Sequence, residues 1–158
     1  MKKTPLKRKT ALKARRPAKR SKIDSKAPKP STKVKQRKKP TITILKKKLW
    51  EECKRIIRAR HGLICYTCGA KTDHPHTGHY IPSSVCSVEM RYSLDNLRPQ
   101  CFSCNIHKSG NWPAYEAHLI IDHGRDFPEQ LKQRNRETTG KQYDILWYTA
   151  KLEEYKQL

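Results

Sequence analysis

Two short segments with the pattern Cys-x-x-Cys decide the fold: residues 65–68 read CYTC and residues 101–104 read CFSC, with 32 residues between them. Two closely spaced pairs of thiolates are a typical tetrahedral ligand set for zinc, and Gly69 suits the tight turn after the first pair. A redox dithiol needs only one such pair, and no βαβ pattern surrounds either of them. We therefore expect one structural Zn²⁺, without an open position for catalysis, on Cys65, Cys68, Cys101 and Cys104.

The other two cysteines are not expected to bind metal. Cys53 lies on the apolar stripe of a predicted helix, which favours a position in the core. Cys86 lies in the segment SVCSV between the two pairs, where we expect a buried strand or loop residue. No apolar segment follows the basic N-terminus, so we expect no secretory leader and a cytoplasmic location. In that compartment, paired cysteines favour metal binding over disulfides.

The composition indicates a polyanionic partner. The chain has 158 residues, with 36 Lys and Arg against 14 Asp and Glu, and a formal net charge of +22. Such a charge favours nucleic acid or an anionic membrane surface as the partner. No stretch is long and apolar enough to cross a bilayer, and a role at a membrane surface would leave both cysteine pairs unexplained. We therefore expect a nucleic-acid partner and no membrane.

Residues 1–40 are expected to form a disordered basic tail. They contain 18 Lys and Arg, five prolines and a single acidic residue, Asp24, so charge repulsion and proline keep the segment open. Such a tail can bind the phosphate backbone by releasing counterions, without reading the bases; a merely solubilising tail is the alternative. The residues expected to bind DNA are Lys2, Lys3, Lys7, Arg8, Arg15, Arg16, Lys38 and Lys39.

Residues 41–158 are expected to form one modest domain. Its core is expected at residues 63–110, which contain both cysteine pairs, and its C-terminal helices at residues 112–158. Only 35% of the residues are hydrophobic, so a bound metal would help to stabilise a small core.

Helices are expected on both sides of this core. Apolar residues recur at three- and four-residue steps over residues 43–60, which predicts a helix that Thr43 caps and Gly62 ends. Asn111 is a candidate N-cap for a helix with Pro113 in its first turn. The C-terminal helices are expected at residues 114–123, near 128–135 and at 141–157.

The residues around the second cysteine pair resemble the signature of the HNH endonucleases. His79 comes before a short predicted strand, Asn96 and Leu97 precede the second pair, and Asn105-x-x-Lys108 follows it directly. The resemblance implies an α+β fold. Its centre would be a small zinc-bound ββα-metal core, flanked by α-helices and preceded by the basic tail.

The resemblance also implies a role for each matching residue, since a hairpin and a helix hold one divalent ion in this family. His79 would be the general base, because a histidine pKa lies near the working pH. Asn105 would offer a neutral oxygen to Mg²⁺ or Mn²⁺, or else cap a helix. Asn96 would tie the hairpin loop together and orient the base. Two cations are expected to contact DNA, namely Lys108 and Arg98.

One position departs from the HNH pattern. Many members have an aspartate directly before the base histidine, where it binds the metal, and this chain has Gly78 there. His74 and His76 lie in a turn that contains proline and aspartate, where we expect solvated side chains. His107 could bind the metal or lie on the surface. The second ligand must therefore come from His107, Asp95, Asp73 or His76.

A longer resemblance points to one family of phage proteins. Gly78-His79-Tyr80, Arg91-Tyr92 with Asn96, and the segment CFSCNIHKSGN at residues 101–111 resemble the NinG (Rap) family, whose members also have glycine before this histidine. The resemblance covers about residues 60–158 and not clearly the tail. It implies a phage- or prophage-encoded endonuclease that cuts branched recombination intermediates, such as Holliday junctions or D-loops, in a bacterial cytoplasm.

Two questions stay open at the level of sequence. Cutting two strands symmetrically favours a homodimer, and the last helix could supply its interface or pack within the chain. A non-catalytic zinc-knuckle protein that binds nucleic acid would share the cysteine pairs and the tail. The two functions differ in whether His79 and Asn105 matter once the chain has folded.

Overall fold

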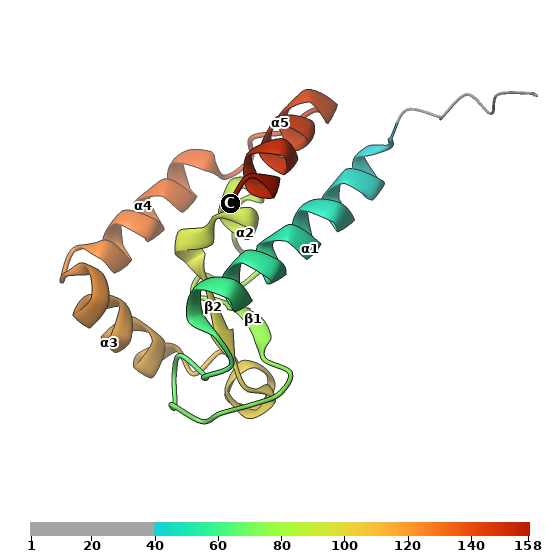
Figure 1. Ribbon diagram of the computed structural model, residues 1–158. Coiled ribbons are helices and arrows are strands. Elements are labelled where there is room, and N and C mark those ends of the chain that lie inside the picture. Colours follow the sequence, from blue (N-terminus) through green and yellow to red (C-terminus); the bar gives the residue numbers. More distant parts are fainter. Residues whose placement is uncertain (1–39) are drawn as a thin grey trace, which may run out of the picture. The chain divides into compact units, whose positions relative to one another are not determined.

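The computed structural model describes residues 40–158, and these form a mixed α+β unit (Figure 1). The predicted basic tail therefore lies outside the described residues. The same holds for its DNA-binding candidates Lys2, Lys3, Lys7, Arg8, Arg15, Arg16, Lys38 and Lys39.

The described residues contain five α-helices and a small antiparallel sheet. The helices are α1 (Ile42–His61), α2 (Val88–Tyr92), α3 (Trp112–His123), α4 (Phe127–Thr138) and α5 (Ile145–Lys156). The strands are β1 (His76–His79) and β2 (Leu97–Gln100), and the short turns are η1 (Leu94–Asn96) and the π-helical η2 (Ser103–His107). Within the described residues, no helix is long and apolar enough to cross a membrane.

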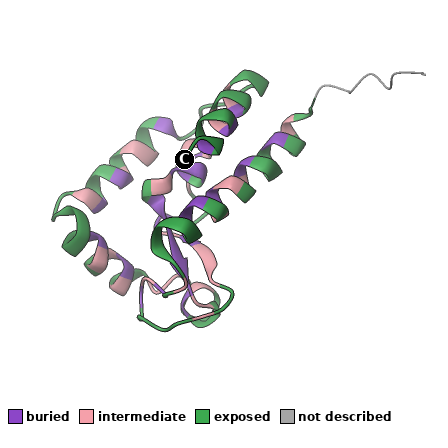
Figure 2. Cartoon of the chain, viewed as in Figure 1, coloured by how far each residue is buried: buried purple, intermediate pink, exposed green. Residues whose placement is uncertain are grey.

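Helix α1 forms where the apolar period predicts it, and its buried side lies along one face in Figure 2. Its N-cap is Thr41 and not Thr43, because the Thr41 hydroxyl accepts a hydrogen bond from the Ile44 N–H (3.5 Å). Gly62 ends the helix as expected, with a positive φ of 67°. The apolar stripe that the sequence indicates is buried, namely Leu45, Leu49, Cys53, Ile56 and Ile57.

The first and last helices share one hydrophobic core. The buried face of α5 packs against α1 around Tyr148, Leu152 and Tyr155, so the apolar face of the last helix is used within the chain. The Tyr92 carbonyl holds the two helices to the middle of the chain. It accepts hydrogen bonds from the Tyr155 hydroxyl (2.8 Å) and the Cys53 thiol (3.6 Å).

A second core lies between the sheet, α2, α3 and α4. Its fully buried residues include Tyr115 and Leu119 of α3 and Leu131 of α4, which pack with Tyr80 and Met90. Helix α4 extends three residues beyond the predicted end near residue 135, and α5 begins at Ile145, later than expected. Asp144 caps α5, because its side chain accepts a hydrogen bond from the Trp147 N–H (3.0 Å).

The register of the sheet decides which residues share a face. His76 pairs with Gln100, Gly78 with Arg98, and His79 with Leu97. Directly opposed residues of an antiparallel pair point to the same side, and neighbours along a strand point to opposite sides. One face therefore carries His76, Gly78, Arg98 and Gln100, and the other carries His79 with the buried Leu97.

Candidate functional site

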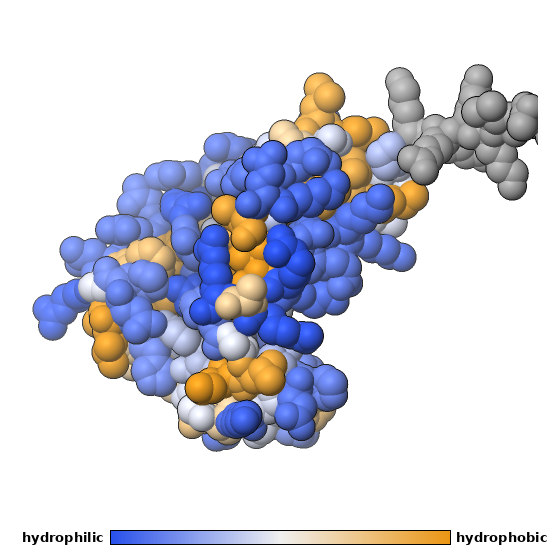
Figure 3. Space-filling view, viewed as in Figure 1, coloured by the Kyte–Doolittle hydropathy of each residue, from blue (hydrophilic) through white to orange (hydrophobic). Residues whose placement is uncertain are grey.

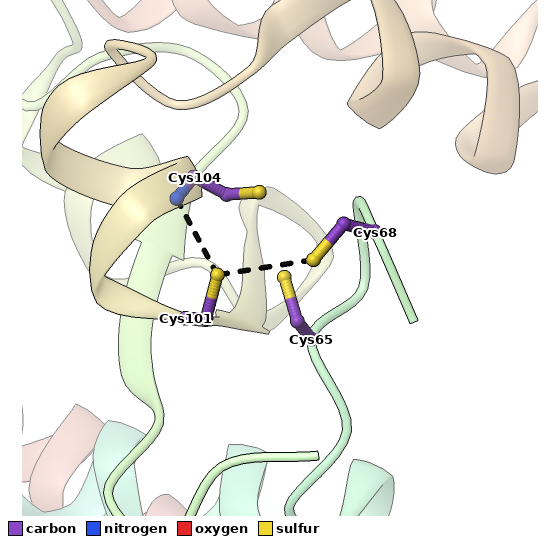
Figure 4. A group of neighbouring side chains, drawn as sticks. All are labelled: Cys65, Cys68, Cys101 and Cys104. Carbon is purple, nitrogen blue, oxygen red and sulfur yellow. Dashed lines mark hydrogen bonds between the residues drawn. The ribbon is translucent and has the colours of Figure 1, made fainter. Parts of the chain in front are cut away.

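The four cysteines of the two pairs come together at one point (Figure 4). Their Sγ atoms all lie within 4.8 Å of one another, and those of Cys68 and Cys101 are 3.8 Å apart. Zinc–sulfur bonds of about 2.3 Å in a tetrahedron place neighbouring sulfurs roughly 3.8 Å apart. This cysteine tetrad could therefore bind a metal ion such as zinc, as the sequence predicts.

Hydrogen-bond donors surround the cysteine tetrad. The Cys104 N–H donates to the Cys101 Sγ (3.4 Å), and the Asn111 side-chain amide donates to the Cys104 Sγ (3.7 Å). Hydrogen bonds of this kind orient the sulfur atoms that would bind a metal ion. Asn111 does stand at the N-cap position of α3, but its φ is +48° and its side chain makes no cap hydrogen bond. The predicted N-cap position is therefore confirmed, whereas the side chain bonds the tetrad and not the helix end.

His79 ends β1 with its ring held on two sides. The ring stacks on the Trp50 ring of α1, with centroids 5.3 Å apart and an interplanar angle of 6°. Its Nε2 lies 3.1 Å from the Arg91 carbonyl oxygen, which can only accept, so Nε2 carries the hydrogen and Nδ1 keeps a free lone pair. Burial lowers the pKa of His79, and the charge of Arg91 adds to this. The ring is therefore a neutral acceptor near neutral pH.

His79 and Asn105 line the same cleft. The cleft has a volume of about 470 Å³. Asn105 directly follows Cys104 in the π-helical turn η2, so the tetrad and the cleft are joined by one peptide bond. Besides these two residues, the walls of the cleft consist of Trp50, Thr77, Pro82, Ser83, Ile106, Ser109 and Gly110.

Asn96 fastens the loop that follows β1. Its side chain is completely buried; its Oδ1 accepts from the Ile81 N–H (2.8 Å), and its Nδ2 donates to the carbonyls of Ile81 (3.3 Å) and Met90 (3.0 Å). Arg91, whose carbonyl contacts His79, directly follows Met90. The position of the histidine ring therefore depends on the asparagine through this loop.

The structure separates the four candidates for a second metal ligand. Asp95 forms an ion pair with Arg134 (2.8 Å), and Asp73 is exposed in a turn. His76, by contrast, is half-buried in β1 with its Nδ1 3.1 Å from the Asn105 side-chain nitrogen. The prediction that His76 is solvated is therefore wrong, whereas His74 is exposed as expected.

His107 lies on the surface and is absent from the walls of the cleft. Its ring packs edge-on against Phe102, with centroids 5.1 Å apart. Residues two apart on a helical turn do not face the same side, and Asn105 takes the side that faces the cleft. Of the two alternatives for His107, the structure therefore supports a surface residue.

Gln100 explains the glycine that replaces the usual aspartate. Its side chain lies across the sheet beside Gly78, so a Cβ on residue 78 would overlap the Gln100 Oε1 atom and lie 2.7 Å from Cδ. Gln100 is completely buried and donates to the Gly110 carbonyl (2.6 Å) and the Thr67 hydroxyl (3.3 Å). No side chain larger than hydrogen fits at residue 78 while Gln100 holds this place.

Arg98 is not available to DNA, which corrects the sequence prediction. The residue is only 4% exposed. Its Nη1 atom donates to the carbonyls of Leu94 (3.1 Å) and Leu97 (2.8 Å), and its Nη2 lies 2.7 Å from the His123 ring. All four residues of β2 are buried, and the backbone carbonyls and His123 hold the guanidinium inside the protein.

Two cations of α1 lie near the cleft and were not predicted from the sequence. Lys54 and Arg58 line a small cavity with His76 and Thr77, beside the cleft. Lys54 also pairs with Glu51 (2.7 Å), whereas Arg58 forms no ion pair with any residue from 40 to 158. The apolar period of α1 indicated its buried face, and no signal in the sequence showed that its basic face borders β1. Lys108, a predicted DNA contact, is exposed.

The comparisons with known proteins agree on one family. A family model described as Bacteriophage Lambda NinG protein matches residues 1–158. The NinG protein of Escherichia phage lambda is 32% identical over 81 residues, which cover 50% of this chain and 39% of that protein. The NinG protein of Salmonella phage P22 is 34% identical over 88 residues, 52% of this chain and 43% of that protein.

The chain thus spans less than half the length of these two relatives. No solved structure matches it. Because the family model covers every residue, the chain belongs to the NinG family.

Proposed function

We propose that the chain is a metal-dependent DNA endonuclease of the HNH type that acts on branched recombination intermediates, such as Holliday junctions or D-loops. The observation that carries the proposal is the cleft shared by His79 and Asn105. A neutral imidazole with one free nitrogen and a carboxamide on a rigid turn are the groups that metal-assisted hydrolysis of a phosphodiester needs. The branched substrate rests on the NinG-family resemblance alone.

In the proposed reaction, His79 acts as the general base. Its Nδ1 accepts a proton from the attacking water, while the hydrogen bond from Nε2 to the Arg91 carbonyl fixes the ring and its tautomer. Asn105 would help to hold a divalent ion such as Mg²⁺ or Mn²⁺, which stabilises charge on the scissile phosphate and on the leaving oxygen. Asn96 is a positioning residue, since it acts through the loop that carries Arg91.

The cysteine tetrad is proposed to hold a structural Zn²⁺. Four cysteines fill a tetrahedral shell and leave no position for water, so this ion would stabilise the fold and take no part in hydrolysis. Its effect on the reaction would be indirect, because it fixes Cys104 and thereby the neighbouring Asn105.

Cations at three places are proposed to hold the DNA. Lys54 and Arg58 of α1 line the small cavity beside the cleft, Lys108 is exposed after η2, and the tail adds the largest excess of positive charge. The face shown in Figure 3 is mostly hydrophilic, with its apolar side chains in separate patches, which suits a polyanion better than an apolar partner.

The decisive experiment compares His79→Ala with His74→Ala, which removes an exposed histidine outside the walls of the cleft. Both variants are purified with zinc retained, and nicking of duplex and four-way-junction DNA is measured with Mg²⁺ and with Mn²⁺. We expect His79→Ala to lose at least 100-fold in rate, the usual effect of removing a general base, and His74→Ala to cut like the wild type.

The result also decides between the enzyme and a non-catalytic zinc-knuckle protein. If His79→Ala cuts as fast as the wild type, the proposed mechanism is wrong. If the wild type binds junction DNA but cuts no DNA with either ion, the binding protein is the correct function.

A further inference from the structure

We propose that His76 and Asn105 together form the catalytic metal site, and that this site contains no carboxylate and prefers Mn²⁺ to Mg²⁺. The inference rests on the proposed nuclease function and names the ligand that the glycine at position 78 leaves open. It starts from the single polar contact that Asn105 makes with another side chain among residues 40–158, which is the contact with His76.

The separation of the two side chains fits one metal ion. The His76 Nδ1 and the amide nitrogen of Asn105 are 3.1 Å apart. Two neighbouring ligands of an octahedral ion with bonds of 2.0–2.1 Å lie roughly 3.0 Å apart. The oxygen and nitrogen of an asparagine amide exchange places by a rotation of the terminal group. The Asn105 oxygen can therefore stand where its nitrogen stands, next to the lone pair of His76.

The geometry of β1 explains why the proposed metal ligand is residue 76 and not residue 78. Both positions lie on the face of β1 that carries Gln100, since His76 pairs with Gln100 and side chains alternate along a strand. Gln100 fills the space beside Gly78, so no ligand can come from that residue. The next side chain on the same face is His76, and its ring reaches Asn105.

Among residues 40–158, the pair of His76 and Asn105 has cations and no acidic side chains in the walls around it. No Asp or Glu lines the cleft of His79 and Asn105 or the small cavity beside His76. The nearby charged groups in these walls are the cations Lys54 and Arg58. A site with two neutral ligands beside two cations binds a dication weakly until a phosphate supplies negative charge.

The same ligands decide which ion the site prefers. Mg²⁺ takes oxygen ligands almost exclusively, whereas imidazole is a ligand for transition-metal ions. A site composed of one imidazole and one carboxamide should therefore bind Mn²⁺ more tightly than Mg²⁺. Neither ion competes well for the soft sulfurs of the cysteine tetrad.

The test measures metal binding directly on the zinc-loaded full chain. Electron paramagnetic resonance of free Mn²⁺ gives the dissociation constant, and competition with Mg²⁺ gives the preference. We expect His76→Ala to weaken Mn²⁺ binding at least 10-fold and the matched control His74→Ala to leave it unchanged. Zinc content and circular dichroism check that each variant is folded.

Two further measurements keep the proposal testable if His76→Ala does not fold. In the wild type, Mn²⁺ should broaden the ring signals of His76 in the proton NMR spectrum before those of His118, which is not among the cleft walls. In addition, His76→Asp should raise the affinity for Mg²⁺ relative to Mn²⁺, because it replaces a nitrogen ligand by a carboxylate.

The outcomes separate this inference from the nuclease itself. If His76→Ala binds Mn²⁺ like the wild type, or if the His76 signals stay sharp, the ligand assignment is wrong even where the wild type cuts DNA. If Mn²⁺ binds through His76 but the wild type cuts no DNA, the metal site stands and the nuclease function fails.

Discussion

Two neighbouring residues, Cys104 and Asn105, face two sites of opposite character. Cys104 belongs to a closed set of four soft sulfurs, whose ligands come from two separate segments of the chain. Asn105 lines an open cleft with a histidine ring and, among the described residues, no acidic side chain on its walls. The difference teaches that one helical turn can serve two sites, because a metal ion on the closed tetrad would fix the backbone of the residue that lines the open cleft.

The largest effect is expected from removing the cysteine tetrad, because this should destroy both sites. Zinc binding to four thiolates contributes about 10–16 kcal/mol, which is as large as the whole stability of a typical domain. We expect Cys104→Ser to unfold residues 63–110 and to abolish cleavage as well. Loss of far-UV circular dichroism and release of zinc to a chromogenic chelator measure this.

The control for that experiment is Cys86→Ser, because Cys86 is half-buried in a loop outside the tetrad. It should retain zinc, and its free energy of unfolding should stay within about 1 kcal/mol of the wild-type value. A Cys104→Ser protein that unfolds at the same denaturant concentration as the wild type would contradict a structural role for the tetrad.

A second variant should damage the open site and leave the closed one intact. Asn96→Ala removes three buried hydrogen bonds and leaves the Ile81 N–H without its acceptor. An unsatisfied buried group costs about 1–3 kcal/mol, so we expect a loss of about 3 kcal/mol in urea unfolding. Zinc should stay bound.

Asn135→Ala is the matched control, since Asn135 accepts one hydrogen bond, from the Ser87 N–H (2.7 Å). Its expected cost is about 1 kcal/mol. Equal losses from the two variants would show that the loop over His79 does not depend on Asn96.

A third pair of variants sharpens the account of residue 78. Gly78→Ala places a methyl group against Gln100, and forcing extra volume into a packed site costs about 1–3 kcal/mol. In a double-mutant cycle, Gly78→Ala should cost less when Gln100→Ala has already removed the obstacle. Additive losses in the cycle would mean that the two side chains do not share this space.

The smallest effect concerns the pH at which the reaction sets in. Burial and the charge of Arg91 hold the pKa of His79 below its ordinary value of 6.5, and the proposed mechanism requires the unprotonated ring. The acidic limb of kcat/KM should therefore have its midpoint below pH 6.5. Trp50→Ala uncovers the ring, so the midpoint should move up towards 6.5.

The sign of the linked effect on stability follows from the same shift. The unfolded chain binds this proton more tightly than the folded chain. The His79 contribution is therefore fully present above pH 6.5 and is lost as the pH falls from 6.5 through the lower pKa of the folded state. A pH–rate midpoint above 6.5 in the wild type would contradict a buried, neutral base.

Much of the fold could be predicted from the sequence, because its signals are local. The cysteine spacing predicted the tetrad, and the apolar period predicted α1 and the buried Cys53. Helix α2 escaped prediction, since its five residues are too few for a period to show. The cap of α1 was misassigned because two threonines lie near its start and only the structure shows which hydroxyl bonds the helix. Asn111 was placed correctly at the start of α3, but its side chain makes no cap hydrogen bond.

The candidate site could be predicted only in part, because its remaining features depend on contacts between distant segments. The stack of Trp50 on His79 joins residues from α1 and β1, and the contact of His76 with Asn105 joins the sheet to η2. Arg98 looked like a DNA contact because charge alone does not reveal the face of a strand.

The packing of α5 on α1 has a consequence for a chain that is still being synthesised. All four cysteines of the tetrad precede α5, so a nascent chain could bind a metal ion there before the last helix has left the ribosome. Helix α1, which carries Trp50, must wait for Tyr148, Leu152 and Tyr155 to cover its apolar face. The stack of Trp50 on His79 is thus expected to form last, so an unfinished chain could hold a metal ion before its cleft is assembled.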